Sequence, residues 1–343
     1  MASIIDVFQN WSLSCKIGTY EDGKYLKSRF TLSSFDGFFS WNYHVAALNG
    51  HMSLIEYLHS TGMSWASFPQ AMDIAASAGH PPMLRWFHIH WPWECSVMAM
   101  DGAAQHGHLL VLEWLHQNRR EGCTTDAMDL AAASGHLNIV KWLHNHREEG
   151  CTKCAMDFAA ESGQLEMVEW LHYNRKEGCT VNAMDGAAKR GRITTLKWLH
   201  QFRSEGCSTE AMDGAAEAGH ISIVQWLHHN RSEGCSTKAM DGAAAAGHMV
   251  VVQWLHDNLS EGCSTKAMDG AASHGHLDMI EWLHSYRSEG CTTLALDFAA
   301  RSGFLHIVEW LHENRQEGGI NAKLFATRNE HVKVVQWLER NGY

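Results

Sequence analysis

Two short motifs recur along the chain at one fixed interval. Ala-Met-Asp begins at residues 71, 99, 127, 155, 183, 211, 239 and 267, and returns as Ala295-Leu296-Asp297. Trp-Leu-His keeps the same 28-residue spacing at 114, 142, 170, 198, 226, 254, 282 and 310. Composition alone does not produce two tripeptides in constant phase. We therefore expect about eleven copies of one supersecondary unit, from about residue 38 to the end.

The first half of a repeat predicts a short helix. In the repeat 123–150, Thr124 is the expected N-cap, because every repeat from Ser96 to Thr292 has Ser or Thr there, where a hydroxyl can accept a free backbone N–H. Met128, Ala131 and Ala132 lie at helical spacing, and the two alanines would let a second helix approach closely. Gly135 is expected to end the helix.

The second half predicts an amphipathic helix that we expect to run to about Glu149. Its apolar positions form one wide face and are Leu137, Ile139, Val140 and Leu143. Gly150 then fits a left-handed C-terminal cap, and Cys151 can provide the small apolar contact beside it.

A unit this short cannot bury its own apolar faces, so the repeats must stack into an all-α helical solenoid. Residues 38–343 are the predicted solenoid. Residues 1–37 do not match the repeat and predict an N-terminal helical cap. The last unit, 319–343, ends in Glu339-Arg340 and is the expected C-terminal cap.

The repeat resembles the ankyrin repeat. The run from Met128 to Leu143, with Leu130-Ala131-Ala132, Gly135-His136-Leu137 and Ile139-Val140-Lys141-Trp142-Leu143, is similar to that family's helix-turn-helix, and the resemblance covers roughly 41–343. It implies an α-helical solenoid that recognises proteins on its concave face and has no catalytic residues. The period of 28 is shorter than the family's 33, so the β-hairpin fingers should be short or missing.

Charge and termini limit the partners and the location. The net charge is −11, and no Lys/Arg-rich run offers the basic patch that nucleic acid or an anionic membrane needs. The first eleven residues lack the basic region of a signal peptide, and no apolar run reaches the roughly 20 residues of a membrane span. We expect an intracellular, cytoplasmic monomer that binds a protein.

Cysteine also repeats in phase with the motifs. Equivalent positions in stacked repeats lie about 10 Å apart, whereas a disulfide needs Cα atoms roughly 4.4–6.8 Å apart. We therefore expect buried free thiols and a reducing compartment. The column comprises Cys95, Cys123, Cys151, Cys179, Cys207, Cys235, Cys263 and Cys291.

Histidine forms a second column, in the last turn of each second helix, where an imidazole can bond terminal carbonyls. The same 10 Å spacing argues against shared zinc, so a structural role is favoured and no cofactor is expected. A metal- or pH-responsive protein built on the His and Cys columns stays the alternative. Protonation of all 25 histidines would move the net charge from −11 to −11 + 25 = +14, which predicts acid sensitivity.

Catalysis is not expected. The sequence has no phosphate loop, no Gly-x-Gly-x-x-Gly and no Gly-x-Ser-x-Gly. Its Asp and His recur in every repeat, which indicates a structural requirement, whereas an active site is normally singular.

Recognition should use positions that vary between repeats, as in a scaffold or adaptor protein. The ends of the first helices vary and mix charges, at His106, Glu161, Lys189, Arg190, Glu217, His274 and Arg301. Trp91-Pro92-Trp93 replaces the usual Arg-x-Glu, so we expect Pro92 to end the helix early and both indoles to turn outward near Trp65 as an exposed binding patch. Filling of a gap beside the N-terminal cap is the alternative. The recurrent Arg and Glu predict a solvated capping network.

Overall fold

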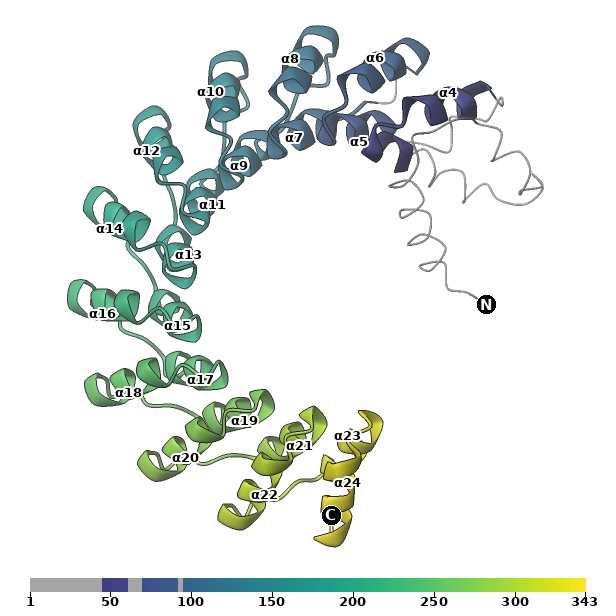
Figure 1. Cartoon of the computed structure of the whole chain (residues 1–343). Coiled ribbons are helices and arrows are strands. Elements are labelled where there is room, and N and C mark those ends of the chain that lie inside the picture. The colour runs from purple at the N-terminus through teal and green to yellow at the C-terminus, as the bar shows by residue number, and fades with distance from the viewer. Residues whose placement is uncertain (1–44, 61–69, 92–94) are drawn as a thin grey trace. The chain divides into compact units, whose positions relative to one another are not determined.

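The computed structural model describes residues 45–60, 70–91 and 95–343 of the chain (Figure 1). Its regular secondary structure is helical, and no strand occurs in these ranges. The predicted N-terminal cap at 1–37 lies outside the described residues, as do Trp65 and Trp93.

Each repeat forms a pair of short antiparallel helices. The first helices are α5 (Ala71–Ser77), α7 (Val97–Gln105), α9 (Asp126–Ala133), α11 (Cys154–Ser162), α13 (Asn182–Lys189), α15 (Thr209–Glu217), α17 (Thr237–Ala245), α19 (Thr265–His274), α21 (Thr293–Ser302) and α23 (Ala322–Arg328). The second helices are α4 (Met52–Ser60), α6 (Pro81–His90), α8 (Leu109–Asn118), α10 (Leu137–His146), α12 (Leu165–Asn174), α14 (Ile193–Phe202), α16 (Ile221–Asn230), α18 (Met249–Asn258), α20 (Leu277–Tyr286), α22 (Leu305–Asn314) and α24 (Val332–Arg340).

These helices fall into two compact units. The described part of one comprises 45–60, 70–91, 95–103 and 110–122, and the other comprises 104–109 and 123–343. In the larger unit, successive first helices pack side by side along the inner side of an arc, and the second helices lie outside them (Figure 1).

The apolar stripes predicted from the repeat form the core. In the repeat 123–150, Met128, Ala131 and Ala132 are at most 1% exposed, and so are Ile139, Val140 and Leu143. Because the alanines carry only a methyl group, adjacent first helices can lie close together. Leu137 is half-buried, so the predicted apolar faces are confirmed at the other positions.

Hydroxyl caps begin the first helices, as predicted. The Thr124 hydroxyl accepts the backbone N–H of Asp126 at 3.1 Å, and Ser208 accepts that of Glu210 at the same distance. At the other end of the pair, Gly150 has a φ of 76°, which an L side chain rarely adopts. The hydroxyls therefore mark the start of the first helices, whereas Gly150 turns the chain four residues after the second helix ends at His146 and does not cap it as predicted.

Two predicted helix ends are wrong. The helix expected to run to about Glu149 ends at His146, because Arg147 is already extended (φ −130°, ψ 150°) and its side chain turns back to pair with Glu149. The helix before Pro92 is not shortened either. It ends at His90, one 28-residue period before Asn118, the last residue of α8, so the chain leaves the helix there regardless of the proline.

Candidate functional site

A carboxylate in the first helix ties each repeat to the next. In α13, the half-buried Asp185 accepts hydrogen bonds from the Ser208 backbone N–H at 2.8 Å and from the Ser208 hydroxyl at 2.6 Å. One repeat later, Asp213 makes the same two bonds with Ser236, at 2.8 and 2.6 Å. The Asp of Ala-Met-Asp is therefore structural, and it holds neighbouring first helices in register.

These carboxylates are shielded from water. Burial raises the pKa of Asp185 and of Asp213 above the ordinary value of 3.8, while the hydrogen bonds from serine act in the opposite direction. Their donors already occupy the carboxylate oxygens, so these groups bind the next repeat and contribute only their charge to the surface.

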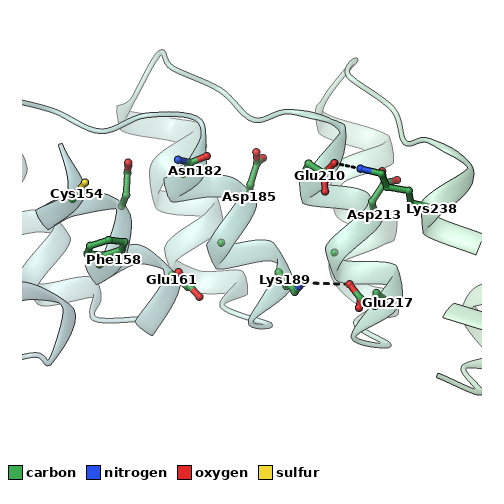
Figure 2. Close-up of a pocket in the computed structure, with 13 residues that line it drawn as sticks. Cys154, Phe158, Glu161, Asn182, Asp185, Lys189, Glu210, Asp213, Glu217 and Lys238 are labelled. Atoms are coloured by element: carbon green, nitrogen blue, oxygen red, sulfur yellow. Dashed lines mark hydrogen bonds and ion pairs between the residues drawn. The ribbon is translucent and has the colours of Figure 1, made fainter. Parts of the chain in front are cut away.

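The first helices α11, α13, α15 and α17 share an open groove with a volume of about 360 Å³ (Figure 2). It lies wholly within the larger compact unit. Its lining residues come from three first helices and the start of a fourth: Cys154, Asp157, Phe158, Glu161, Asn182, Asp185, Gly186, Lys189, Glu210, Asp213, Gly214, Glu217 and Lys238.

Two glycines hollow the floor of the groove. A Cβ added at Gly186 would lie 3.0 Å from the Glu161 Cβ, and one at Gly214 would lie 3.0 Å from the Lys189 Cβ. The absence of a side chain thus permits close packing between helices, although glycine inside a helix costs about 1 kcal/mol relative to alanine. In α11 the same position carries Phe158, which is 39% exposed although it is a large aromatic residue.

The polar wall of the groove is mostly acidic. Its lining includes six carboxylates and two lysines. Lys238 pairs with Glu210 at 2.5 Å and Lys189 pairs with Glu217 at 3.3 Å, as the dashed lines in Figure 2 show. Glu161 pairs outside the lining set, with Arg190 at 3.0 Å. These ion pairs are exposed, so each is weak and a stronger partner can replace it.

The structure brings together three of the residues chosen from sequence variation: Glu161, Lys189 and Glu217 all line the groove. Arg190 lies beside it through its ion pair. The remaining three residues do not line this groove. They are exposed at the ends of their own first helices and are His106, His274 and Arg301.

The expected outward turn of Trp91 is wrong. Its side chain is 3% exposed and stacks on Phe87, with 5.4 Å between ring centroids. Its ring also lies edge-on to His59 at 5.8 Å. Trp91 stands one period before Arg119, whose guanidinium lies 3.3 Å from the His88 Nδ1. The indole therefore packs against a histidine as the arginine does in the next repeat.

Several lining residues were missed from the sequence. Cys154, Asn182, Glu210 and Lys238 all directly precede Ala-Met-Asp, and Phe158 directly follows it. The position before Ala-Met-Asp varies between repeats as much as the helix ends do, whereas the position after it is glycine in five of nine copies. Variability would have found the first set, but only the backbone geometry shows that both positions face one groove.

The outer helices carry a second network. The His172 ring lies edge-on to Trp198 of the next repeat at 5.3 Å, and its Nδ1 accepts a hydrogen bond from Arg203 at 3.2 Å. Arg203 in turn pairs with Glu205. The Arg203 side chain is only 22% exposed, so this network is less solvated than expected. The expected bonds from this histidine column to terminal carbonyls give way to bonds between repeats.

The buried cysteines have a packing role as well. The described cysteines are free thiols, and six of the predicted column are buried. In the described ranges no group of three or more His, Cys, Asp or Glu could hold a metal ion.

None of the described helices combines the length and apolar character required to cross a membrane.

Paired helices stacked side by side, with a variable inner face, define the class of helical-repeat solenoid proteins. Family models described as ankyrin repeats match residues 100–185, 43–88, 240–284 and 268–312. The chain belongs to the ankyrin-repeat proteins. Such repeats generally mediate interactions between proteins and are typically non-enzymatic. No curated protein matches the chain.

Proposed function

We propose that the chain is a protein-binding scaffold or adaptor whose groove over α11, α13, α15 and α17 takes a segment of a partner protein. The observation that carries this proposal is the groove itself, about 360 Å³ in volume, where the positions that vary between repeats converge. Positions released from the packing constraint are the ones that can encode specificity.

The chemistry of the groove selects the partner segment. Six carboxylates against two lysines favour a segment rich in Lys and Arg, because opposite charge steers association and repels acidic competitors. The exposed ring of Phe158 stands at one end of the groove and offers an aromatic anchor. We expect a basic segment with one large apolar side chain.

Site-specific photo-crosslinking tests this function. A photoreactive phenylalanine analogue replaces Phe158 in one protein and Tyr173 in another, because Tyr173 is exposed on the outer helix α12 and provides the matched control. We expect specific crosslinks from position 158 alone, and the crosslinked segments, sequenced by mass spectrometry, should be basic.

A charge-reversal variant sharpens the test. Glu217→Lys removes the partner of Lys189 and adds a positive charge inside the groove, so crosslinking at 158 should fall about tenfold. Equal crosslinking from positions 158 and 173, or acidic crosslinked segments, would contradict the proposal.

A further inference from the structure

A recurrent cradle for a guanidinium group lies where each outer helix meets the following loop. For Arg203 it consists of His172, Gly178, Cys179 and Glu205. The Arg203 Nε donates to Glu205 at 3.2 Å, and the guanidinium contacts the Cys179 thiol. An η-nitrogen lies 2.6 Å from where a Gly178 Cβ would be, so any larger residue there would collide with the arginine. We call such a set the guanidinium cradle.

The cradle is filled along the larger unit. Arginine hydrogen-bonds the histidine of the preceding repeat at 3.3 Å for Arg175 with His144 and for Arg287 with His256, and at 3.4 Å for Arg315 with His284. Arg231 also pairs with its glutamate, Glu233, although no hydrogen bond joins it to the His200 Nδ1. At the end of the chain the Tyr343 hydroxyl takes this place, 3.0 Å from the His312 Nδ1.

One repeat breaks this pattern. Leu259 occupies the arginine position, and its backbone (φ −129°, ψ 153°) matches that of Arg203 (φ −122°, ψ 151°). The rest of the cradle is retained in His228 at the end of α16, Gly234 and Cys235 after it, and Glu261 in the next loop. The substitution thus removes the guanidinium and keeps the groups that would bind one.

The space above the glycine is open in this repeat. The nearest atom to a Cβ built at Gly234 is the Glu261 Oε1, 3.9 Å away, so the shorter Leu259 side chain does not reach it. Cys235 is half-buried, whereas the corresponding thiols of Cys207 and Cys263 are buried. Loss of the arginine has therefore opened a slot between two loops.

The polar groups of the slot have no partner within the described residues. The His228 ring still lies edge-on to Trp254 at 5.3 Å, but leucine replaces the arginine that donates to the equivalent nitrogen of His172. Glu261 is exposed and forms no ion pair with the described chain, whereas Glu233 and Glu289 each bind the arginine two residues before them. Glu261 and His228 thus keep the positions that Glu205 and His172 hold around Arg203, without an arginine between them.

The presence of Glu261 favours a guanidinium over an aromatic ring as the occupant of this slot. Where Trp91 contacts the preceding histidine, the residue two positions later in the sequence is Trp93 and not a glutamate. Where arginine fills the cradle, Glu stands two residues later. Leu259 is followed by Glu261, so this slot has the chemistry of the arginine cradles.

We propose that the cradle of His228, Gly234, Cys235 and Glu261 binds an arginine side chain presented by a protein partner. The guanidinium donates to the Glu261 carboxylate and to the His228 Nδ1 while its face covers Gly234, as Arg203 does within its own cradle. This site uses His228 of α16 and residues of the α16–α17 and α18–α19 loops, and it does not depend on the proposed groove.

Nuclear magnetic resonance of ring-labelled histidine tests the site, with His228→Gln assigning the resonance. The probe is N-acetyl-arginine methylamide, compared with the matching lysine and citrulline compounds, which supply a different cation and a neutral isostere. We expect a saturable shift of the His228 resonance at millimolar arginine probe and at least about threefold weaker binding of the other two.

Two variants test whether the probe binds at this cradle. Leu259→Arg supplies the missing guanidinium and should abolish the shift at His228. Adding Arg203→Leu should move the response to His172, because that cradle is then emptied in the same way. Circular dichroism checks that both variants keep their helix content, and if the double variant unfolds, Leu259→Arg alone decides.

Four results would overturn the proposal: no saturable shift in the intact protein below about 50 mM probe, an equal response to lysine or citrulline, a shift retained in Leu259→Arg, or tighter binding of free L-arginine than of the blocked probe. The last result would indicate a small-molecule site instead of a partner's side chain.

Discussion

At the scale of single residues, the carboxylate in Ala-Met-Asp holds the repeats together. Asp213 is 3% exposed and accepts two hydrogen bonds from Ser236, so Asp213→Ala would leave a buried N–H and a hydroxyl without their acceptor. We expect a loss of about 1–3 kcal/mol in the free energy of unfolding, seen as a lower urea midpoint. Asp213→Asn keeps one oxygen and should lose less. An unchanged midpoint for the alanine variant would show that the bonds are dispensable.

The Arg–Glu pairs on the outer side give a pH dependence with a defined sign. The hydrogen bond from Arg287 lowers the pKa of Glu289 below its ordinary 4.5. A carboxylate with a lowered pKa in the folded state contributes stability above its unfolded pKa and loses it as the pH falls through the folded value. The urea midpoints of the intact protein and Glu289→Gln should therefore differ above about pH 4.5 and converge below it.

The contribution of Asp185 to the free energy of unfolding has the opposite pH dependence. Burial raises its pKa, so this contribution decreases as the pH rises. A difference between the intact protein and Glu289→Gln that grows as the pH falls would contradict the assignment of the Arg287 bond. The acid sensitivity expected from the 25 histidines stays a separate prediction, which a flat stability curve from pH 7.5 to 5 would count against.

At the scale of helices, glycine inside the first helices lets neighbours approach. A Cβ at Gly270 would lie 2.6 Å from the Ala245 Cβ, a contact that real side chains do not make. Gly270→Ala should therefore destabilise the protein, although alanine is the better helix former by about 1 kcal/mol. Thermal unfolding measures the loss, and Ala245→Gly in the same chain should restore most of the stability by returning the space. Additive effects of the two changes would exclude this contact as the cause.

The helix pairs, the hydroxyl caps and the core could be predicted because the same sequence pattern recurs in each repeat, so each copy is a further check on the interpretation. Thr124 required only local rules for helix ends. The burial of Trp91 could not be predicted from its neighbours in sequence alone, because besides Phe87 of its own helix it packs on His59 of the preceding repeat. The groove was half predicted: variation at Glu161, Lys189 and Glu217 indicated a surface, but the contribution of Phe158 depends on which side of the helix faces the hollow.

At the scale of the whole molecule, the contacts between neighbouring repeats recur at equivalent positions every 28 residues, so a complete repeat can be removed. Deletion of 207–234 joins Gly206 to Cys235 and brings Asp185 opposite Ser236 instead of Ser208, with the same residue types at each position. The shortened protein should keep its helix content per residue and unfold cooperatively in urea, since only one neighbour interface is lost. Deletion of 207–220, which removes half a repeat, is the control and should disrupt the stack.

The same deletion separates the two proposed binding sites. It removes Glu210 and Glu217 from the groove, so crosslinking from position 158 should fall. It places His200 and Gly206 beside Cys235, Leu259 and Glu261, which rebuilds the guanidinium cradle from equivalent residues, so the arginine probe should still bind, with His200 now reporting the shift. A molten product would refute the modular stack, and loss of both responses from a folded product would show that the two sites depend on one another.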